Sequence, residues 1–450
     1  MKEFNFEKLP IVEIANEIIM DAVNKGASDI HFDPSQDSLK IRFRIDGILS
    51  DYSIIPSKYK RNMISRIKMI AGMNIMETRL PQDGAIKSKI GERFLDLRVS
   101  SLPTNNAEKI VIRILDYSMS LAGLDNLGFS EDAMEKINRL IKIPNGIILV
   151  TGATGTGKST TLYSILQKLN TEAVNIITVE DPVEMDIEGI NQVQTQSEIG
   201  LTFATILRSI LRQDPNIIMI GEIRDDETAR IAVRASITGH LVLSSLHTNN
   251  SLNTIERLTD MDVERYLLGS SLEGIISQRL ARKVCPECSI KRPTTDYERQ
   301  VFKTVLGKDV LEMVVANKEG CPKCTHGYKG RLAILEVLVM NEKIKDAITN
   351  GANKNTLREL VYTGDVVTLL QDGLNKVVLG ETTFEEILKI VDLENDMTQY
   401  NDDNLKTNLI MAQQAHKADN KTNDKPITSN ISSEFKIEKT NNENIETVEF

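Results

Sequence analysis

The sequence predicts an α/β protein in which a doubly wound core of parallel strands follows a smaller α+β domain. Four short segments between residues 146 and 243 are continuously apolar, as in strands buried on both faces of a parallel sheet, and helical stretches separate them. The first of these segments runs into a glycine-rich loop that ends in Lys158-Ser159. Residues 1–116 show instead the mixed helical and alternating periods of an α+β domain.

Length and composition restrict the class of protein. The 450 residues correspond to about three structural units at roughly 150 residues each. Hydrophobic residues make up 41% and charged residues 26%, which is typical of a soluble globular chain and excludes global disorder. The net charge of −10 disfavours nucleic acid as the main partner. No apolar run approaches the roughly 18 residues of a membrane span, and Met1–Glu7 contain no apolar signal region, so we expect a cytoplasmic protein.

The α+β domain is expected to begin with a helix. Apolar residues recur every three or four positions from Ile11 to Ala22, the spacing of one buried helical stripe. Apolar and charged residues then alternate from Leu39 to Asp46, as in a strand with one solvated face, and Asp46-Gly47 favours a hairpin turn. The remaining elements expected here are a helix and two strands, at residues 58–73, 93–100 and 109–115.

Composition divides the rest of the chain into three parts. Residues 117–130 carry Gly, Ser and Asn without periodicity, and we interpret them as a linker. The core domain is expected over residues 131–394. Its four apolar strands are expected at residues 146–150, 176–179, 217–220 and 241–243. Residues 395–450 are polar and nearly free of aromatic side chains, so we predict a disordered tail that cannot bury enough apolar surface to offset its ordering entropy.

The segment from Gly152 to Ser159 matches the pattern G-x-x-x-x-G-K-[ST] of a phosphate-binding loop. It follows a buried strand and precedes a helix, so backbone N–H groups and the positive helix N-terminus can converge on one phosphate. Lys158 is expected to reach the β- and γ-phosphates, and the Ser159 hydroxyl to ligate Mg²⁺. The residues expected to bind the nucleotide are Gly152, Thr154, Gly155, Thr156, Gly157, Lys158, Ser159 and Thr160.

Acidic clusters follow the second and third apolar strands, at residues 180–184 and 221–225. Because the carboxyl ends of parallel strands meet at one edge of a sheet, we expect both clusters beside the phosphate-binding loop. An acid there would orient water for attack on a phosphate, whereas a solvated loop carboxylate is the alternative for either cluster alone. His247 follows the fourth strand and would approach the γ-phosphate, while His240, at the opposite end, has either a structural or a sensory role.

These motifs resemble those of the secretion ATPases of type II secretion and type IV pilus systems. The family's Walker A, Asp, Walker B and His boxes correspond to residues 152–159, 177–184, 221–225 and 238–248. The resemblance extends over residues 10–392. It implies an α/β fold with a RecA-like P-loop NTPase core, an N-terminal α+β domain and a small zinc-binding insertion. The further N-terminal domain of many assembly ATPases has no counterpart, so we expect no cyclic-dinucleotide sensing of the kind attached to it.

The resemblance also implies roles for single residues. Glu222 would be the general base or water-orienting acid, Glu180 would assist it, and His247 would contact the γ-phosphate. Arg98 and Arg113 would reach the nucleotide in the active state, although from spacing alone they are strand residues on a solvated face. The implied protein is a cytoplasmic homo-hexamer that hydrolyses MgATP. It would drive an inner-membrane platform protein that assembles pilin or pseudopilin subunits, and it would meet the membrane only through that partner.

The four cysteines of the chain form two C-x-x-C pairs, Cys285/Cys288 and Cys321/Cys324. Four thiolates complete a tetrahedral shell with no open position, which predicts a structural zinc ion. Redox chemistry and disulfides are the alternatives, and no thioredoxin-like βαβ unit lies nearby. We expect the residues between the pairs to form a small helical insertion, within a zinc-binding subdomain at residues 281–331.

Three other functions stay open at this point. A pilus-retraction motor would share the core, but by resemblance such motors lack the cysteine pairs, whereas assembly and export ATPases usually carry them. A nucleotide-gated scaffold would bind ATP without hydrolysing it, and the presence of Glu180, Glu222 and His247 disfavours that function. A DNA or RNA motor is disfavoured by the acidic net charge and by the lack of a segment that mixes basic and aromatic residues.

Overall fold

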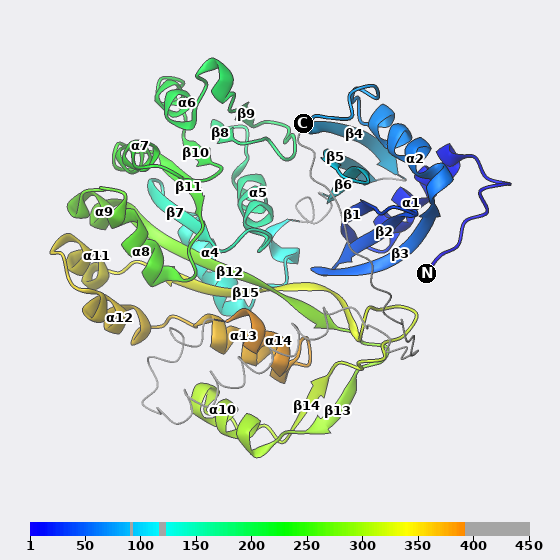
Figure 1. Ribbon diagram of the computed structural model, residues 1–450. Helices are drawn as coiled ribbons and strands as arrows, with labels where there is room; N and C mark the ends of the chain where they lie inside the picture. The colour runs from blue at the N-terminus through cyan, green and yellow to red at the C-terminus, as the bar shows by residue number, and fades with distance from the viewer. Residues whose placement is uncertain (91–92, 117–122, 392–450) are drawn as a thin grey trace, which may run out of the picture.

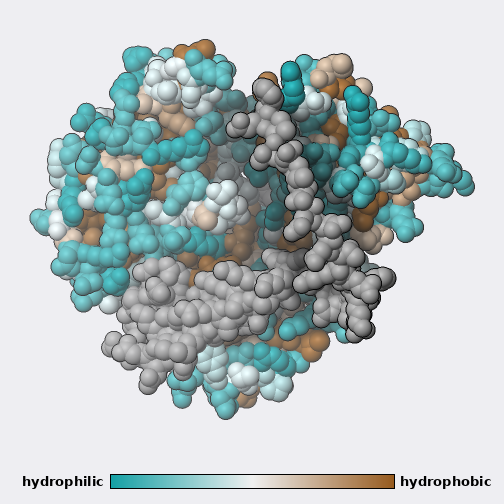
Figure 2. Space-filling view, viewed as in Figure 1, coloured by the Kyte–Doolittle hydropathy of each residue, from teal (hydrophilic) through white to brown (hydrophobic). Residues whose placement is uncertain are grey.

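The computed structural model describes residues 1–90, 93–116 and 123–391, and these residues form two large β-sheets with helices packed against them (Figure 1). The predicted linker lies partly outside the described residues, and the predicted tail lies entirely outside them. Within the described residues, no helix combines the length and the apolar character that crossing a membrane requires. The described surface seen in Figure 2 is mostly hydrophilic, with apolar residues in small, separate patches.

The first sheet has six strands in the order β3-β2-β1-β6-β5-β4. The strands are β1 Ala27–Pro34, β2 Ser38–Ile45, β3 Ile48–Pro56, β4 Gln82–Ile90, β5 Arg93–Thr104 and β6 Ala107–Asp116. Helices α1 (Ile11–Asn24) and α2 (Ser57–Ile70) pack on one face, where the apolar stripe predicted from Ile11 to Ala22 is largely buried. The opposite face carries charged side chains, so the strands alternate between an apolar core face and a polar face.

A buried ion pair stabilises this first sheet. Lys68 on α2 and Glu108 on β6 lie 2.6 Å apart, and only 1% and 6% of their side chains are exposed. The Lys68 ammonium also donates to the Glu77 carbonyl at 2.6 Å, and Ser101 Oγ lies 3.4 Å from Glu108 Oε1. Removing one partner would leave an uncompensated buried charge, which is far more costly than losing an exposed pair.

We therefore expect Lys68→Met to lower the free energy of unfolding by about 3–5 kcal/mol. The matched control is Lys40→Met, because Lys40 pairs with Asp51 at 2.7 Å while both side chains are more than one-third exposed. That variant should lose no more than about 1 kcal/mol. Thermal and urea unfolding followed by circular dichroism measure both variants, and equal losses would contradict the buried-pair argument.

The second sheet has seven strands in the order β15-β12-β7-β11-β10-β8-β9. The strands are β7 Gly146–Thr151, β8 Ile176–Glu180, β9 Asn191–Gln194, β10 Ile217–Ile220, β11 Leu241–Leu246, β12 Leu272–Val284 and β15 Tyr328–Val339. The four apolar segments predicted as strands are β7, β8, β10 and β11, and they pair in parallel. Successive residues of β7 point to opposite faces, and both faces are apolar because helices cover each of them.

Two groups of helices cover this second sheet. On one face lie α4 (Glu131–Leu140) and α5 (Lys158–Leu169). On the other face lie α6 Phe203–Ile210, α7 Asp226–Ile237, α8 Ser251–Asp260, α9 Arg265–Ser271, α11 Glu342–Thr349 and α12 Lys354–Tyr362. The short 3₁₀ turns are η1 Leu124–Asn126 and η2 Ser197–Ile199. The arrangement is the mixed α/β fold expected from the alternation of apolar strands and helices.

Three strands of this sheet differ from the sequence prediction. The sequence did not predict β9, β12 or β15, because polar residues interrupt their apolar patterns. Strand β12 pairs in parallel with β7 and antiparallel with β15, whose register places Val284 opposite Tyr328. The chain between β12 and β15 was expected to be helical, but it holds the two-stranded pair β13 (Ile290–Pro293) and β14 (Glu312–Val315) as well as α10 (Asp296–Leu306). Helices α13 (Leu369–Val378) and α14 (Phe384–Ile390) pack with this part.

Candidate active site and metal centre

The glycine-rich loop joins the end of β7 to the start of α5. Gly152, Gly155 and Gly157 have φ angles of +150°, +81° and +88°, which side chains with a Cβ atom rarely adopt. A Cβ on Gly152 would lie 2.5 Å from the carbonyl oxygen of Gln278, so this glycine is also required by the close approach of β12. The loop is therefore a tight turn whose backbone is stabilised from the neighbouring strand.

Lys158 and Ser159 begin helix α5. Lys158 is 9% exposed, and its Nζ donates to the carbonyls of Gly152 and Ala153 at 2.9 and 3.2 Å, so its charge lies inside the loop. Burial lowers the pKa of the Lys158 ammonium from its ordinary value. Ser159 is exposed in the first helical turn, where its hydroxyl is open to a ligand. These positions suit an anion above the helix N-terminus.

Glu222 follows β10 and lies next to two basic side chains. Its Oε1 accepts from Arg224 Nη2 at 2.5 Å, and its Oε2 lies 3.1 Å from His247 Nε2. Burial by itself would raise the pKa of Glu222, but the hydrogen bonds from Arg224 and His247 outweigh it and hold the pKa below its ordinary value. The carboxylate is therefore ionised at neutral pH. A lowered pKa makes this carboxylate a weaker base than an ordinary glutamate.

Arg224 connects the two acidic clusters. Besides Glu222, it contacts Asp181 in the loop after β8, with Nη1 3.3 Å from Asp181 Oδ2. Strands β8 and β10 are parallel neighbours, so the two clusters meet at the carboxyl edge of the sheet. His247 comes from the loop after β11, which lies between β10 and β7. The structure thus brings Glu222, His247 and the glycine-rich loop to one edge.

Glu180 lies deeper, at the last position of β8. It is 3% exposed, and its Oε1 accepts from Thr178 Oγ1 at 2.5 Å and from Gln192 Nε2 at 3.0 Å. The Tyr163 hydroxyl of α5 donates to its other oxygen. Burial and the neighbouring carboxylate raise the pKa of Tyr163, which keeps that hydroxyl a donor. In this arrangement Glu180 ties α5 to β8, and its predicted assistance to Glu222 stays a prediction.

The two arginines of the first sheet have different surroundings. Arg98 and Arg113 face each other across β5 and β6. Arg98 reaches toward the second sheet, where its Nη2 lies 3.2 Å from Glu184 Oε2 and 3.4 Å from the Val183 carbonyl. Arg113 stays on the first sheet, paired with Asp29 at 3.2 Å, and is 65% exposed. Only Arg98 therefore contacts the segment that carries the first acidic cluster.

His240 has the partners of a structural residue. It lies before β11, at the edge of the sheet opposite to the glycine-rich loop, and its Nδ1 lies 2.9 Å from the Ala235 carbonyl at the end of α7. The structure thus supports the structural alternative for His240, and it separates this residue from His247.

A cavity of about 920 Å³ lies beside the glycine-rich loop. Its lining combines the first sheet and its loops, the loop and the start of α5, β12 and the segment after the second cysteine pair. Residues that represent these parts are Lys25, Ser50, Gly157, Thr160, Leu280 and Thr325. The cavity is large enough for a ligand of nucleotide size.

Side chains of β12 belong to the site although no sequence motif points to them. Gln278 is 3% exposed, and its amide contacts both the glycine-rich loop and α5. Ser277 Oγ contacts Thr151, the residue before the loop, at 3.1 Å. A usable signal is present, because Ser277, Gln278 and Arg279 are consecutive polar residues between the apolar residues Ile276 and Leu280.

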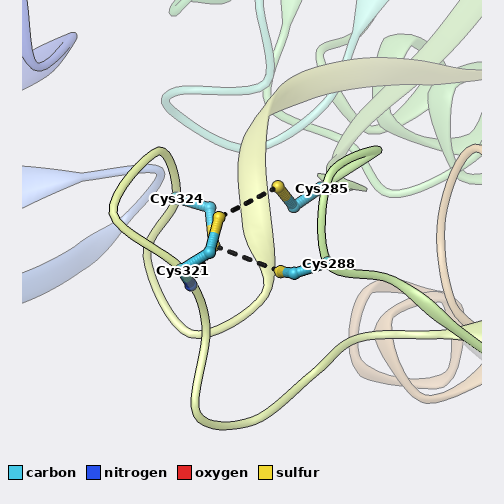
Figure 3. A group of neighbouring side chains, drawn as sticks. All are labelled: Cys285, Cys288, Cys321 and Cys324. Carbon is cyan, nitrogen blue, oxygen red and sulfur yellow. Dashed lines mark hydrogen bonds between the residues drawn. The ribbon is translucent and has the colours of Figure 1, made fainter.

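The four cysteines form one cluster, shown in Figure 3. Their sulfur atoms all lie within 4.8 Å of one another, and the closest pairs are 3.6–3.8 Å apart. Strands β12 and β15 explain this, because the register that pairs their ends brings the two C-x-x-C loops together. Burial would raise the pKa of Cys324, but hydrogen bonds from the backbone of Cys321 and Gly327 and from neighbouring thiols lower it to about 7.

The sulfur positions fit a tetrahedral metal ion better than disulfides. All four cysteines are free, and the separations far exceed the roughly 2.05 Å of an S–S bond. A tetrahedron built from Zn–S bonds of about 2.3 Å has edges of about 3.8 Å. The donor set and its spacing therefore suit zinc.

Comparisons with known proteins give the family that this chain is similar to. The family described as "Type II/IV secretion system protein" matches residues 5–389. The "Putative type II secretion system protein E" of Escherichia coli (strain K12) is 45% identical over 382 residues, which are 85% of this chain and 77% of that protein. The "Type IV pilus assembly ATPase PilB" of Myxococcus xanthus (strain DK1622) is 45% identical over 381 residues, which are 84% of this chain and 67% of that protein.

Two solved structures are similar in fold. The Legionella pneumophila ATPase DotB has a TM-score of 0.62 at 22% identity, and the similarity covers 86% of this chain and 97% of that one. The pilus retraction motor PilT with bound ADP has a TM-score of 0.53 at 25% identity, covering 88% of this chain and 98% of that one.

Proposed function

The chain belongs to the type II/IV secretion system protein family, and from that premise we propose that it is a motor ATPase that powers the assembly of a type IV pilus or a type II secretion pseudopilus. The observation that carries the proposal is the meeting of the glycine-rich loop, Glu222 and His247 at one edge of the second sheet. The proposed fold is a RecA-like P-loop NTPase core at residues 131–394, with an N-terminal α+β domain at residues 1–116.

The proposed substrate is MgATP. Backbone N–H groups of the loop Gly152–Gly157 and the N-terminus of α5 would bind the phosphates, with Lys158 exchanging its carbonyl partners for phosphate oxygens. Ser159 would hold Mg²⁺, which supplies charge neutralisation at the β- and γ-phosphates. The cavity beside the loop would take the rest of the nucleotide between the two domains, and its size and lining support that placement.

Hydrolysis would depend on the charged groups at the sheet edge. Glu222 would orient the attacking water, and His247 would contact the γ-phosphate, as their 3.1 Å separation allows. Glu180 would fix the position of the first acidic cluster relative to α5. Arg98 and Arg113 would bring positive charge from the N-terminal domain when the angle between the domains changes, and the contact of Arg98 with Glu184 supports this for Arg98.

The proposed assembly is a homo-hexamer at the cytoplasmic face of the inner membrane, acting on an inner-membrane platform protein. The names of the relatives support a place in a secretion or pilus machine. Cys285, Cys288, Cys321 and Cys324 would bind a structural Zn²⁺ within the subdomain at residues 281–331. Residues 117–130 would be the linker between the domains.

Pilus retraction is the second candidate function, because a retraction motor is among the similar structures. Two observations favour assembly. The relative named as a pilus assembly ATPase is 45% identical to this chain, whereas the retraction motor is 25% identical. The cysteine cluster is, by the resemblance, a feature of assembly and export ATPases. A nucleotide-gated scaffold that does not hydrolyse ATP is the third candidate.

Steady-state phosphate release together with a nucleotide-binding isotherm tests the proposal. We expect purified protein to bind ATP and to release phosphate only when Mg²⁺ is present. Lys158→Ala should lose at least about a hundredfold in turnover, because it removes a positive group from the phosphates. Lys168→Ala is the matched control, since Lys168 lies on the same helix and pairs with Asp125 away from the loop. Binding without phosphate release would favour the scaffold, and no binding would refute the ATPase.

A further inference from the structure

The amide side chain of Gln278 on β12 makes one hydrogen bond to the glycine-rich loop and one to α5. Its Nε2 donates to the Thr156 carbonyl at 2.8 Å, and its Oε1 accepts from the Thr161 hydroxyl at 2.8 Å. The two partners are 122 and 117 residues away in sequence. Gln278 is buried, with 3% of the residue exposed, so neither bond is open to exchange with bulk water.

The loop is built around this amide. A Cβ on Gly157 would lie 2.7 Å from Gln278 Nε2, and a Cβ on Gly152 would lie 2.5 Å from the Gln278 carbonyl oxygen. Both ends of the loop therefore come into close contact with one residue of β12. Since a glycine loop is otherwise the most flexible kind of backbone, an external contact is needed to keep its N–H groups converging on one point.

We propose that Gln278 is a positioning residue that holds the phosphate-binding loop in the shape that accepts a nucleoside triphosphate. The inference rests on the proposed function, because it assumes that the loop binds the phosphates of ATP. In this role Gln278 acts through Thr156 and Thr161, the two residues to which its amide is hydrogen-bonded, and it also lines the cavity beside the loop.

Glutamine is the side chain that this position requires. The amide donates to a carbonyl and accepts from a hydroxyl at the same time, which an ionised carboxylate of the same shape cannot do. A protonated glutamate can do both, because its O–H donates and its other oxygen accepts. This difference gives a readout that a purely structural role in the core would not produce.

The test is the affinity for a slowly hydrolysed ATP analogue, ATPγS, measured by titration calorimetry with Mg²⁺ present at about pH 8 and about pH 5.5. Gln278→Met should bind at least about tenfold more weakly than wild type at both pH values, because two buried polar groups lose their partner. Gln278→Glu should be as weak at the higher pH and recover to within about threefold of wild type at the lower pH, since burial favours the protonated acid. Thr161→Val should cause a smaller loss of affinity. Added to Gln278→Met in a double variant, it should cause no further loss.

Controls separate this inference from the proposed function. The wild type is measured at both pH values, because histidines ordinarily change charge over this range and the charged groups Lys158, Arg279 and Glu222 lie around the loop. Lys283→Met, which changes an exposed side chain on the same strand, should bind as wild type does. Wild type that fails to bind ATPγS would refute the proposed function. If the wild type binds and the ratio of the Gln278→Glu affinity to the wild-type affinity is the same at both pH values, the role of Gln278 is overturned while the proposed function stands.

Discussion

Glu222→Gln should lower the turnover of ATP by about 10²- to 10⁴-fold while ATP binding persists. The change keeps the shape of the side chain and removes its negative charge, so the site loses the group that orients the attacking water. Binding should persist because Lys158 is hydrogen-bonded to loop carbonyls, at 2.9 and 3.2 Å, and not to Glu222.

Steady-state phosphate release and a binding isotherm, run on the same preparation, check this result. The matched control is Glu256→Gln on α8, because Glu256 forms an exposed pair with Lys354 at 2.7 Å outside the site. That variant should retain both activities. Retained turnover in Glu222→Gln would remove Glu222 from the mechanism. Loss of binding would show that the Glu222–Arg224–His247 contacts hold the loop rather than act on water.

Removal of the metal should cause the largest loss of stability. Structural zinc contributes about 10–16 kcal/mol of apparent binding energy in isolated zinc-finger peptides, and each cysteine here belongs to one four-sulfur set. We expect about one zinc ion per chain by metal analysis. Chelation, or Cys288→Ser, should lower the free energy of unfolding of the cysteine-bearing insertion by at least about 5 kcal/mol, so that it unfolds before the remainder of the chain.

Thermal unfolding and limited proteolysis measure this loss, and new cleavage sites should fall between residues 289 and 320. Ser289→Ala is the matched control, because Ser289 follows Cys288 directly and supplies no thiolate. A metal-free protein with unchanged melting and cleavage would contradict the four-thiolate site. In that case the backbone pairing of β12 with β15 would hold the ends of these strands together without a metal.

The part of the candidate site that sequence could predict consists of local motifs. The glycine-rich loop is predictable between a strand and a helix because its residues are consecutive and both elements flank it directly in sequence. The two cysteine pairs were assigned to one metal for a similar reason, since each pair is a chelate of its own. Glu222 and His247 were placed at one sheet edge by the rule for parallel strands, and the structure puts them 3.1 Å apart.

Other features depended on contacts between distant segments. The insertion between the cysteine pairs is expected to be helical, but besides α10 it holds β13 and β14, which pair directly with Ile290 opposite Val315 although α10 separates the two strands in sequence. The partners of Glu180 also come from other elements, because Tyr163 and Gln192 bind its oxygens, and its assistance to Glu222 stays a prediction. Arg98 and Arg113 cannot be distinguished in sequence, and of the two only Arg98 contacts the first acidic cluster, through Val183, which is 85 residues away in sequence.

Sequence alone determined the α/β class, the loop that is proposed to bind phosphate and the two thiol pairs, because each depends on residue types within a few positions of one another. The tertiary structure alone decided which strand lies against that loop. Strand β12 is separated from the glycine-rich loop by more than one hundred residues in sequence. Only the folding of the sheet brings the Gln278 amide within 2.8 Å of Thr156. Such a hydrogen bond needs a donor and an acceptor in close and defined geometry. When the two residues are far apart in sequence, tertiary packing sets that geometry and no local sequence pattern encodes it.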